Sequence, residues 1–136
     1  MKKLLCIASL FISTIVFGQE SVDTQTGILS FKTETIDYGT INKNSNGNRT
    51  FSFKNTGKSP IIITSVKGSC GCTVATKPSK PIMPNETSEI GVTYDTKRVG
   101  SFSKTITVVS NASEKSKVLR IKGMISKAET TQVAVK

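Results

Sequence analysis

Apolar residues recur at every second position of the stretch 119–125, which reads Leu-Arg-Ile-Lys-Gly-Met-Ile. Leu119, Ile121 and Ile125 share one parity, and Arg120 and Lys122 share the other. Successive side chains of a β-strand point to opposite faces, so this alternation predicts a strand with one apolar and one wet face. Such a strand can hide its apolar face only against a second layer of structure.

Short runs of the same kind lie upstream and are separated by residues that favour turns, such as the cluster 42–48. The stretch 29–39 predicts the first strand region, and the β-branched residues of 61–66 predict a strand buried on both faces. The runs amount to about seven strands, which predicts an all-β, immunoglobulin-like antiparallel β-sandwich. The other runs are defined by Phe51, Phe53, Ile90, Val92, Tyr94, Phe102, Ile106 and Val108.

The aromatic residues after position 18 all lie in or beside an expected strand, which predicts that they pack in the core. The sequence has no tryptophan, and the only cysteines after position 18 are separated by a single residue. The disulfide that joins the two sheets of an antibody domain therefore has no counterpart here, and we expect apolar burial to hold the sandwich together. These aromatic residues are Phe31, Tyr38, Phe51, Phe53, Tyr94 and Phe102.

The first residues differ in kind from the rest and predict a helical secretory signal peptide over residues 1–18. Lys2 and Lys3 precede the apolar run 4–17, and Gly18 follows it. That run is shorter than the roughly 20 residues of a membrane-spanning helix. We therefore expect cleavage after Gly18, export to the periplasm or the extracellular space, and no membrane span afterwards. The expected divisions of the remaining chain are a flexible linker (19–27), the sandwich domain (28–126) and a flexible tail (127–136).

The chain is basic, with 19 lysines and arginines against 9 acidic residues and a net charge of +10. Removal of Lys2 and Lys3 leaves 17 basic residues against 9, a net charge of +8. The lysines are scattered along the chain, whereas nucleic-acid-binding proteins usually cluster lysine and arginine on one element. We therefore expect a lysine-coated surface, a protein or an envelope polymer as the partner, and no nucleic acid.

Histidine is absent from the sequence. Its absence excludes Ser-His-Asp and Cys-His nucleophile systems and histidine-ligated catalytic zinc. Glu86 and Glu89, three positions apart, are interpreted as solvated surface residues beside a proline turn. We expect no catalytic residue and no cofactor, so the protein is predicted not to be an enzyme.

Cys70-Gly71-Cys72 is the one unusual motif, and Cys6 would be lost with the signal peptide. In a strand, Cys70 and Cys72 would face the same side with Cα atoms roughly 6.5 Å apart, at the outer limit for a disulfide. Three roles stay open: two small side chains in a tightly packed segment, a disulfide that Gly71 makes possible by bending the backbone, and a thiolate pair for redox chemistry or for a soft metal such as Cu(I). The order of preference is packing, then the disulfide, then the metal or redox role.

A set of motifs resembles an exported bacterial family known as domain of unknown function 1573. The motifs are Ile36 to Ile41, Phe51 to Pro60, Ser69-Cys70-Gly71-Cys72-Thr73, Pro81 to Glu86, Gly100 to Lys104 and Val109 to Asn111. The resemblance covers about residues 29–126 and implies an immunoglobulin-like domain related to the major-sperm-protein and cilia-associated type. It also implies an exported protein of the kind common in the Bacteroidetes. It implies no reaction, and no role for Cys70 or Cys72.

One departure from the family falls at Asn85, where the family usually has glycine. Pro84-Asn85 predicts a type II turn, because proline suits its second position and asparagine tolerates a positive φ at its third.

The function expected from these observations is a secreted or periplasmic, non-enzymatic binding module of unknown ligand. Two alternatives remain. One is a thiol-redox or copper-handling protein that acts through Cys70 and Cys72, and the other is a structural envelope component that associates with itself.

Overall fold

The computed structural model describes residues 25–127, so the expected signal peptide and most of the expected linker and tail lie outside the described residues. The described chain forms eight β-strands and no helix. No helix within this range could therefore span a membrane. The strands are β1 (Leu29–Phe31), β2 (Thr35–Asn42), β3 (Asn48–Asn55), β4 (Ile63–Gly68), β5 (Thr73–Thr76), β6 (Thr87–Tyr94), β7 (Gly100–Ser110) and β8 (Ser116–Ser126).

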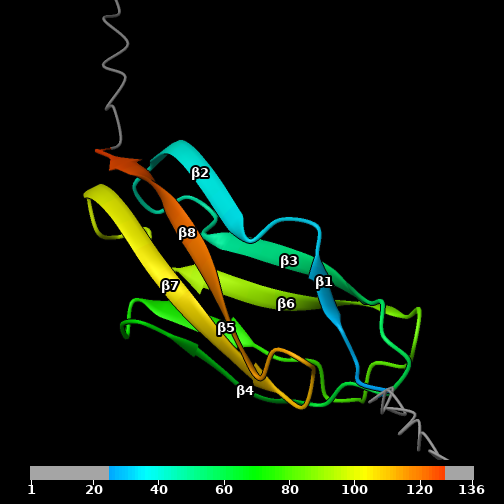
Figure 1. Ribbon diagram of the computed structural model, residues 1–136. Coiled ribbons are helices and arrows are strands. Elements are labelled where there is room, and N and C mark those ends of the chain that lie inside the picture. The colour runs from blue at the N-terminus through cyan, green and yellow to red at the C-terminus, as the bar shows by residue number, and fades with distance from the viewer. Residues whose placement is uncertain (1–24, 128–136) are drawn as a thin grey trace, which may run out of the picture.

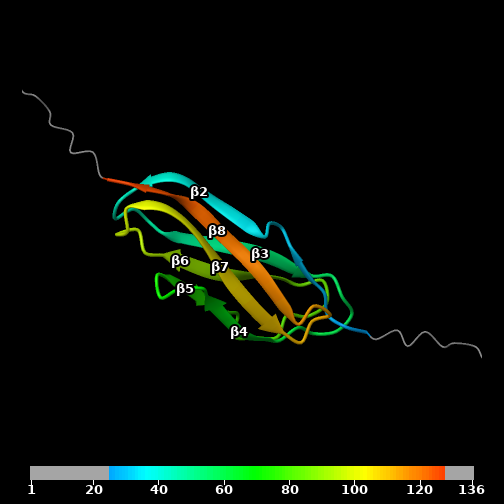
Figure 2. The same ribbon diagram turned by 60° about the vertical axis from the view of Figure 1, so that its left-hand side comes forward.

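The strands form two four-stranded sheets that face each other (Figures 1 and 2). The first sheet has the order β1-β3-β6-β5, and the second has the order β2-β8-β7-β4. With β2 set aside, these orders correspond to the ABED and CFG sheets of an immunoglobulin constant domain. The predicted all-β, immunoglobulin-like sandwich is confirmed, with eight strands where the sequence indicated about seven.

The expected first strand region, 29–39, is two strands that belong to different sheets. β1 pairs antiparallel with β3, and β2 pairs parallel with β8, which is the one parallel pairing among the described strands. The pairing of β2 is interrupted between Asp37 and Thr40, where Gly39 has a φ of 62°. The Gly39 N–H donates to Asp37 Oδ1 at 2.8 Å, and this bond lowers the pKa of Asp37 below its usual value. A bulge of this kind also makes the β2 edge a poor template for another strand.

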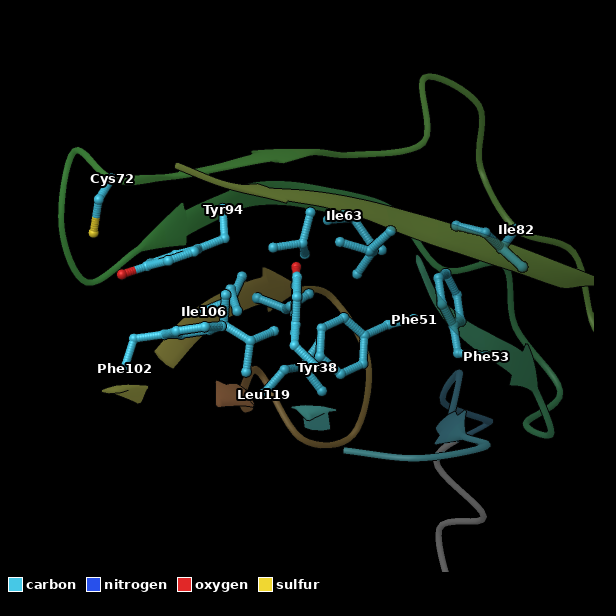
Figure 3. Close-up of a cluster of buried hydrophobic side chains, with 14 of the residues drawn as sticks. Tyr38, Phe51, Phe53, Ile63, Cys72, Ile82, Tyr94, Phe102, Ile106 and Leu119 are labelled. Carbon is cyan, nitrogen blue, oxygen red and sulfur yellow. The ribbon is translucent and has the colours of Figure 1, made fainter. Parts of the chain in front are cut away.

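The core lies between the sheets and is built from the residues of the alternating parity (Figure 3). Phe51, Ile90, Ile106, Leu119 and Ile121 are completely buried. The prediction that the aromatic residues pack in the core is confirmed for five of them. Phe31 is only half-buried and packs against Phe53, with ring centroids 5.2 Å apart.

One expectation for the middle of the chain is wrong. The strand of residues 61–66 is not buried on both faces, because Ile62 is 50% exposed and β4 is an edge strand with one solvated face. Cys70 and Cys72 occupy the turn between β4 and β5. The turn at Pro84-Asn85 is as predicted: Asn85 has a φ of 67°, and the Glu86 N–H donates to the Met83 carbonyl at 3.0 Å.

Backbone hydrogen bonds continue the first sheet beyond the start of β1. The Lys58 N–H donates to the carbonyl of Thr26, and the Ser113 N–H donates to the carbonyl of Gly27 at 2.9 Å. Thr26 and Gly27 fall in the stretch expected to be a flexible linker, and these two hydrogen bonds hold them against the β3–β4 and β7–β8 connections.

Candidate functional site

Three connecting segments come together at one end of the sandwich, on the left in Figure 1. They are the β2–β3 loop (43–47), the β4–β5 turn (69–72) and the β6–β7 loop (95–99), and they are joined there by residues 126–127 at the end of β8. We call this region the disulfide end. It draws on both sheets, because β2, β4, β6 and β8 all finish there.

Hydrogen bonds tie the three segments of the disulfide end to one another. The Asn44 N–H donates to the Thr96 carbonyl at 3.2 Å, and the Thr96 hydroxyl donates to the Ser45 carbonyl at 2.7 Å. The Asp95 N–H donates to the Cys72 carbonyl at 2.9 Å. These bonds make the disulfide end a connected surface, not a set of independent loops.

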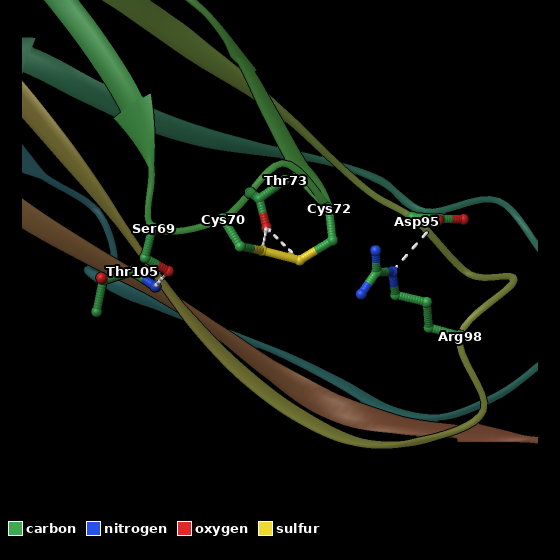
Figure 4. Close-up of a disulfide and its surroundings, with 7 residues drawn as sticks. All are labelled: Ser69, Cys70, Cys72, Thr73, Asp95, Arg98 and Thr105. Carbon is green, nitrogen blue, oxygen red and sulfur yellow. Dashed lines mark hydrogen bonds and ion pairs between the residues drawn. A yellow bond between two sulfur atoms is a disulfide. The ribbon is translucent and has the colours of Figure 1, made fainter.

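Cys70 and Cys72 form a disulfide that closes the β4–β5 turn (Figure 4). Their Cα atoms are 5.3 Å apart, closer than the separation expected for a strand, because the chain turns at Gly71. The turn is anchored on both sides. The Thr73 N–H donates to the Cys70 carbonyl at 3.2 Å, and the Ser69 N–H donates to the Thr105 carbonyl at 2.8 Å.

The two sulfur atoms share one hydroxyl partner. Thr73 Oγ1 lies 3.8 Å from Cys70 Sγ and 3.9 Å from Cys72 Sγ. A disulfide sulfur carries no proton, so the Thr73 hydroxyl is the donor in both contacts. Thr73 itself is only 5% exposed, which holds this hydroxyl against the sulfurs.

The copper alternative requires Cys70 and Cys72 as two thiolates, whereas the structure has their sulfur atoms bonded to each other. Over residues 25–127 there is no group of three or more cysteine, aspartate or glutamate side chains placed to hold a metal ion.

An aromatic cluster forms the floor of the disulfide end (Figure 3). The rings of Tyr94 and Phe102 stack with their centroids 3.8 Å apart. The rings of Tyr38 and Phe102 are arranged edge to face, with their centroids 5.3 Å apart. The Tyr38 hydroxyl donates to the Gly47 carbonyl at 2.8 Å, and the Arg49 guanidinium lies 4.3 Å above the Tyr38 ring. Cys72, at the end of the β4–β5 turn, belongs to the same buried core as these three rings, so the core anchors one side of that turn.

The two tyrosines of this cluster predict a loss of stability at alkaline pH. Burial raises the pKa of both Tyr38 and Tyr94 above 10.0, opposed for Tyr38 by Arg49. The tyrosines of the unfolded chain therefore lose their protons at a lower pH than those of the folded protein. The contribution of Tyr38 and Tyr94 to the free energy of unfolding is complete below pH 10.0 and is lost as pH rises through their folded pKa values. We expect the urea midpoint to fall between about pH 9 and about pH 11. The fall should be smaller in the Tyr38→Phe/Tyr94→Phe variant, and an equal fall would contradict the assignment, since lysine deprotonation is common to both proteins.

Cationic side chains outnumber acidic ones at the disulfide end. Lys43, Lys97, Arg98 and Lys127 are exposed there, and Asp95 is the one acidic residue of these segments. Arg98 Nε lies 3.5 Å from Asp95 Oδ2, but such an exposed pair contributes at most about 1 kcal/mol. A carboxylate of a partner can therefore compete for Arg98.

The opposite end of the sandwich has charges of both signs. Lys117 Nζ lies 2.7 Å from Glu34 Oε1 and 3.2 Å from Glu114 Oε2, and Glu86 is exposed in the proline turn. The expectation of a lysine-coated surface therefore misses a difference between the ends. Lys43 and Lys97 are 54 positions apart in the sequence, and the hydrogen bond from Asn44 N–H to the Thr96 carbonyl places their two loops side by side. Asp95 and Arg98 were also not identified from the sequence, because no local pattern connects them to the cysteines. Thr73 belongs to the Ser69–Thr73 motif, but its contact with both sulfurs was not predicted.

The disulfide is expected to contribute modestly to stability. A closed loop of three residues removes only about 1.5–2 kcal/mol of chain entropy from the unfolded state. Reduction should therefore lower the free energy of unfolding by about that amount and leave the sandwich folded. Urea unfolding with and without a phosphine reductant measures it, and complete unfolding on reduction would contradict the prediction.

A second hollow of about 270 Å³ lies on the first sheet, remote from the disulfide end. It is lined by Phe31 and Phe53 together with Lys32, Lys54 and Thr87. Its lining includes one half-buried ring, Phe31, and no cysteine.

Comparison with known proteins finds one family model, described as "Protein of unknown function (DUF1573)", which matches residues 29–125. No curated protein matches the sequence. A protein of unknown function from Porphyromonas gingivalis W83 is similar in structure, with a TM-score of 0.65 and 17% identity over 74% of this chain and 47% of that one, so the present chain spans about half of its length.

Two further solved structures place the fold among PapD-like domains. The ASH/PapD-like domain 7 of human CEP192 has a TM-score of 0.59 and 10% identity, over 93% of this chain and all of that domain. The CsuC–CsuE chaperone–tip adhesion subunit pre-assembly complex from Acinetobacter baumannii has a TM-score of 0.52 and 10% identity, over 73% of this chain and 57% of that one. At these identities the similarity concerns the fold alone.

Proposed function

Since the chain belongs to the DUF1573 family and folds as a PapD-like sandwich, we propose that it is an exported, non-enzymatic module that binds another protein through its disulfide end. The observation that carries the proposal is the disulfide end itself. It is a hydrogen-bonded surface with exposed cations in the β2–β3 loop, in the β6–β7 loop and at the end of β8. The β6–β7 loop also has an apolar side chain, Val99, which is 48% exposed. An acidic protein surface with an apolar anchor has the matching chemistry.

Two features support a protein partner over an envelope polymer. The disulfide can be engaged covalently by a thiolate, a group that a protein partner carries in cysteine. The fold is also that of one chain in the CsuC–CsuE complex, in which a chaperone is assembled with a tip adhesion subunit. We extend only the general mode of action, a sandwich that holds a protein, to this chain.

Photo-crosslinking at two exposed positions tests which end binds. A photoreactive amino acid replaces Val99, 48% exposed at the disulfide end, or Met83, 52% exposed in the proline turn of the opposite end. In cells that express the protein naturally, we expect a crosslinked second protein from position 99 and none from position 83. Crosslinks from position 83 alone, or none from either, would refute the proposal.

Charge reversal tests the expected acidity of the partner. Lys97→Glu/Arg98→Glu should abolish the crosslink from position 99, whereas the matched Lys80→Glu/Lys115→Glu variant at the opposite end should keep it. If the crosslinked product is a second copy of this chain, the self-associating envelope component replaces the binding module as the better account.

Export is tested on the same cells. The proposal expects the protein to be recovered outside the cytoplasm with Gln19 as its first residue. Recovery of the intact chain from the cytoplasm, with Met1 or Lys2 first, would contradict it.

A further inference from the structure

We propose that the Cys70–Cys72 disulfide exchanges with a thiol of the partner protein, and that Cys70 Sγ is the sulfur that the incoming thiolate attacks. This inference rests on the proposed function in one respect, namely that a partner reaches the disulfide end. The exchange chemistry is tested below with a small thiol, so the two proposals can fail separately.

The two half-cystines differ in exposure. Cys70 is half-buried, whereas Cys72 is 6% exposed and belongs to the core with Tyr94 and Phe102. Gly71, between them, is exposed, and a Cβ built on it would meet nothing within 4 Å. An attacking thiolate needs access to a sulfur along the S–S axis, and solvent reaches the turn from the side of Cys70 and Gly71.

Opening the disulfide leaves the framework of the turn in place. The hydrogen bonds from Thr73 N–H to the Cys70 carbonyl and from Asp95 N–H to the Cys72 carbonyl involve no sulfur. They keep both cysteines on the same short turn after reduction. The disulfide is therefore a group that can open and close within a folded protein.

The Thr73 hydroxyl assists the departure of the thiolate. It lies 3.8 Å from Cys70 Sγ and 3.9 Å from Cys72 Sγ, so it can donate to the negative charge on either sulfur, and hydrogen bonds to charged acceptors are about twice as strong as neutral ones. The choice of Cys70 Sγ as the attacked sulfur therefore rests on its greater exposure. Figure 4 shows Arg98 paired with Asp95, whose N–H donates to the Cys72 carbonyl. A leaving thiol of lower pKa departs faster, so the Thr73 hydrogen bond speeds the exchange.

The exchange consists of two successive thiolate attacks that move two electrons from the partner dithiol to the Cys70–Cys72 disulfide. The partner thiolate forms a bond to Cys70 Sγ as the Cys70–Cys72 bond breaks, and the bonding pair leaves on Cys72 Sγ. A second thiolate of the partner then attacks its own sulfur in the mixed disulfide and releases Cys70 as a thiolate. The partner dithiol has lost two electrons and become a disulfide, and the Cys70–Cys72 disulfide has gained them. The protons of the partner thiols pass to solvent or to the new thiolates.

Trapping with reduced glutathione tests the site of attack on the otherwise unaltered protein, produced from Gln19 to Lys136. The reaction is quenched with acid, remaining thiols are alkylated, and peptide mapping locates the glutathione. We expect the mixed disulfide on Cys70. Glutathione on Cys72, equal amounts on both, or reduction that occurs only as fast as global unfolding would overturn the proposal.

Single-cysteine variants measure the same asymmetry as a rate. The Cys70 thiol of Cys72→Ala should react with an aromatic disulfide at least about tenfold faster than the Cys72 thiol of Cys70→Ala. In urea the two rates should converge, because the difference arises from the fold. Equal rates in the folded proteins would contradict the assignment.

Thr73→Val tests the hydroxyl, since valine keeps the shape of threonine and removes the donor. In the reduced protein, thiolate absorbance followed against pH should show a higher pKa for the Cys72 thiol in Thr73→Val, with slower exchange at neutral pH. Thr76→Val, the matched change on the exposed face of β5, should leave both unaltered. An unchanged thiol pKa in Thr73→Val would show that the hydroxyl only fills space.

Discussion

Replacing Phe51 by alanine is expected to lower the free energy of unfolding by about 3–5 kcal/mol. Phe51 is completely buried at the centre of β3, opposite Ile90 of β6, and its ring occupies the space between the sheets. Truncation removes the transfer free energy of the ring and leaves a cavity, because the two sheets are fixed by their backbone pairing and can close over it only in part. Urea unfolding monitored by circular dichroism measures the loss.

The neighbouring residue provides the control. Thr50 lies on the exposed face of the same strand, opposite Gly91, so Thr50→Ala should change stability by no more than about 0.5 kcal/mol. Comparable losses from the two substitutions would mean that β3 does not present one face to the core and one to solvent.

Asn55→Leu is expected to be about as destabilising, by about 3–5 kcal/mol, although leucine is close to asparagine in size. Asn55 is completely buried, and its side chain makes all the hydrogen bonds open to it. Oδ1 accepts from the N–H groups of Ile28 and Gly57, at 3.2 and 3.0 Å. Nδ2 donates to the carbonyls of Ser59 and Ile82, at 2.8 and 3.0 Å. Leucine leaves these backbone groups without that partner, and buried groups in this state cost roughly 1–3 kcal/mol each.

The Asn55→Asp variant separates lost hydrogen bonds from lost packing. A carboxylate accepts from Ile28 and Gly57 but faces the carbonyls of Ser59 and Ile82 without a proton to donate. Its destabilisation should therefore be partly relieved at low pH, where the protonated acid can donate to one carbonyl. A pH-independent loss in Asn55→Asp, or a loss below 1 kcal/mol in Asn55→Leu, would contradict this role.

The sheet faces were predictable from the sequence because burial follows parity within each strand. In β8 the buried residues Leu119, Ile121 and Ile125 are those that alternation selects. Changes of parity along the first strand region contain a further signal. Leu29 and Phe31 are odd, Ile36 and Tyr38 are even, and Ile41 is odd again. The first change marks the passage of the chain from one sheet to the other, and the second marks the bulge at Gly39.

Other elements leave little trace in the sequence. β5 has four residues, Thr-Val-Ala-Thr, and its most apolar side chain, Val74, is 62% exposed because the strand forms a sheet edge. The parity rule fails there, since the edge position, not amphipathicity, decides which side is covered. The roles of Asn55 are equally hidden, because its partner Ile82 is 27 residues away and is reached only in the folded chain.

The candidate site was likewise predictable from the sequence only in part. Cys70 and Cys72 stood out by type and spacing, and a disulfide was one of three roles open to them. Their Cα atoms are 5.3 Å apart, closer than a strand would place them, because the chain turns at Gly71. The basic character of the disulfide end depends on Lys43, Lys97 and Arg98 coming together from separate loops, which is a property of the topology. The proposed binding and the proposed thiol exchange both use this end, and the exchange requires that the sandwich persists when the disulfide opens.

The most direct test of this requirement is amide hydrogen exchange measured residue by residue by NMR on the oxidised and the reduced protein. We expect the amides of Phe51, Ile90, Ile106 and Leu119 to stay protected after reduction, and large spectral changes to be limited to the β4–β5 turn and to its contacts at Asp95 and Thr105. Loss of protection throughout both sheets on reduction would mean that the two sulfurs hold the fold together, and the account would be wrong.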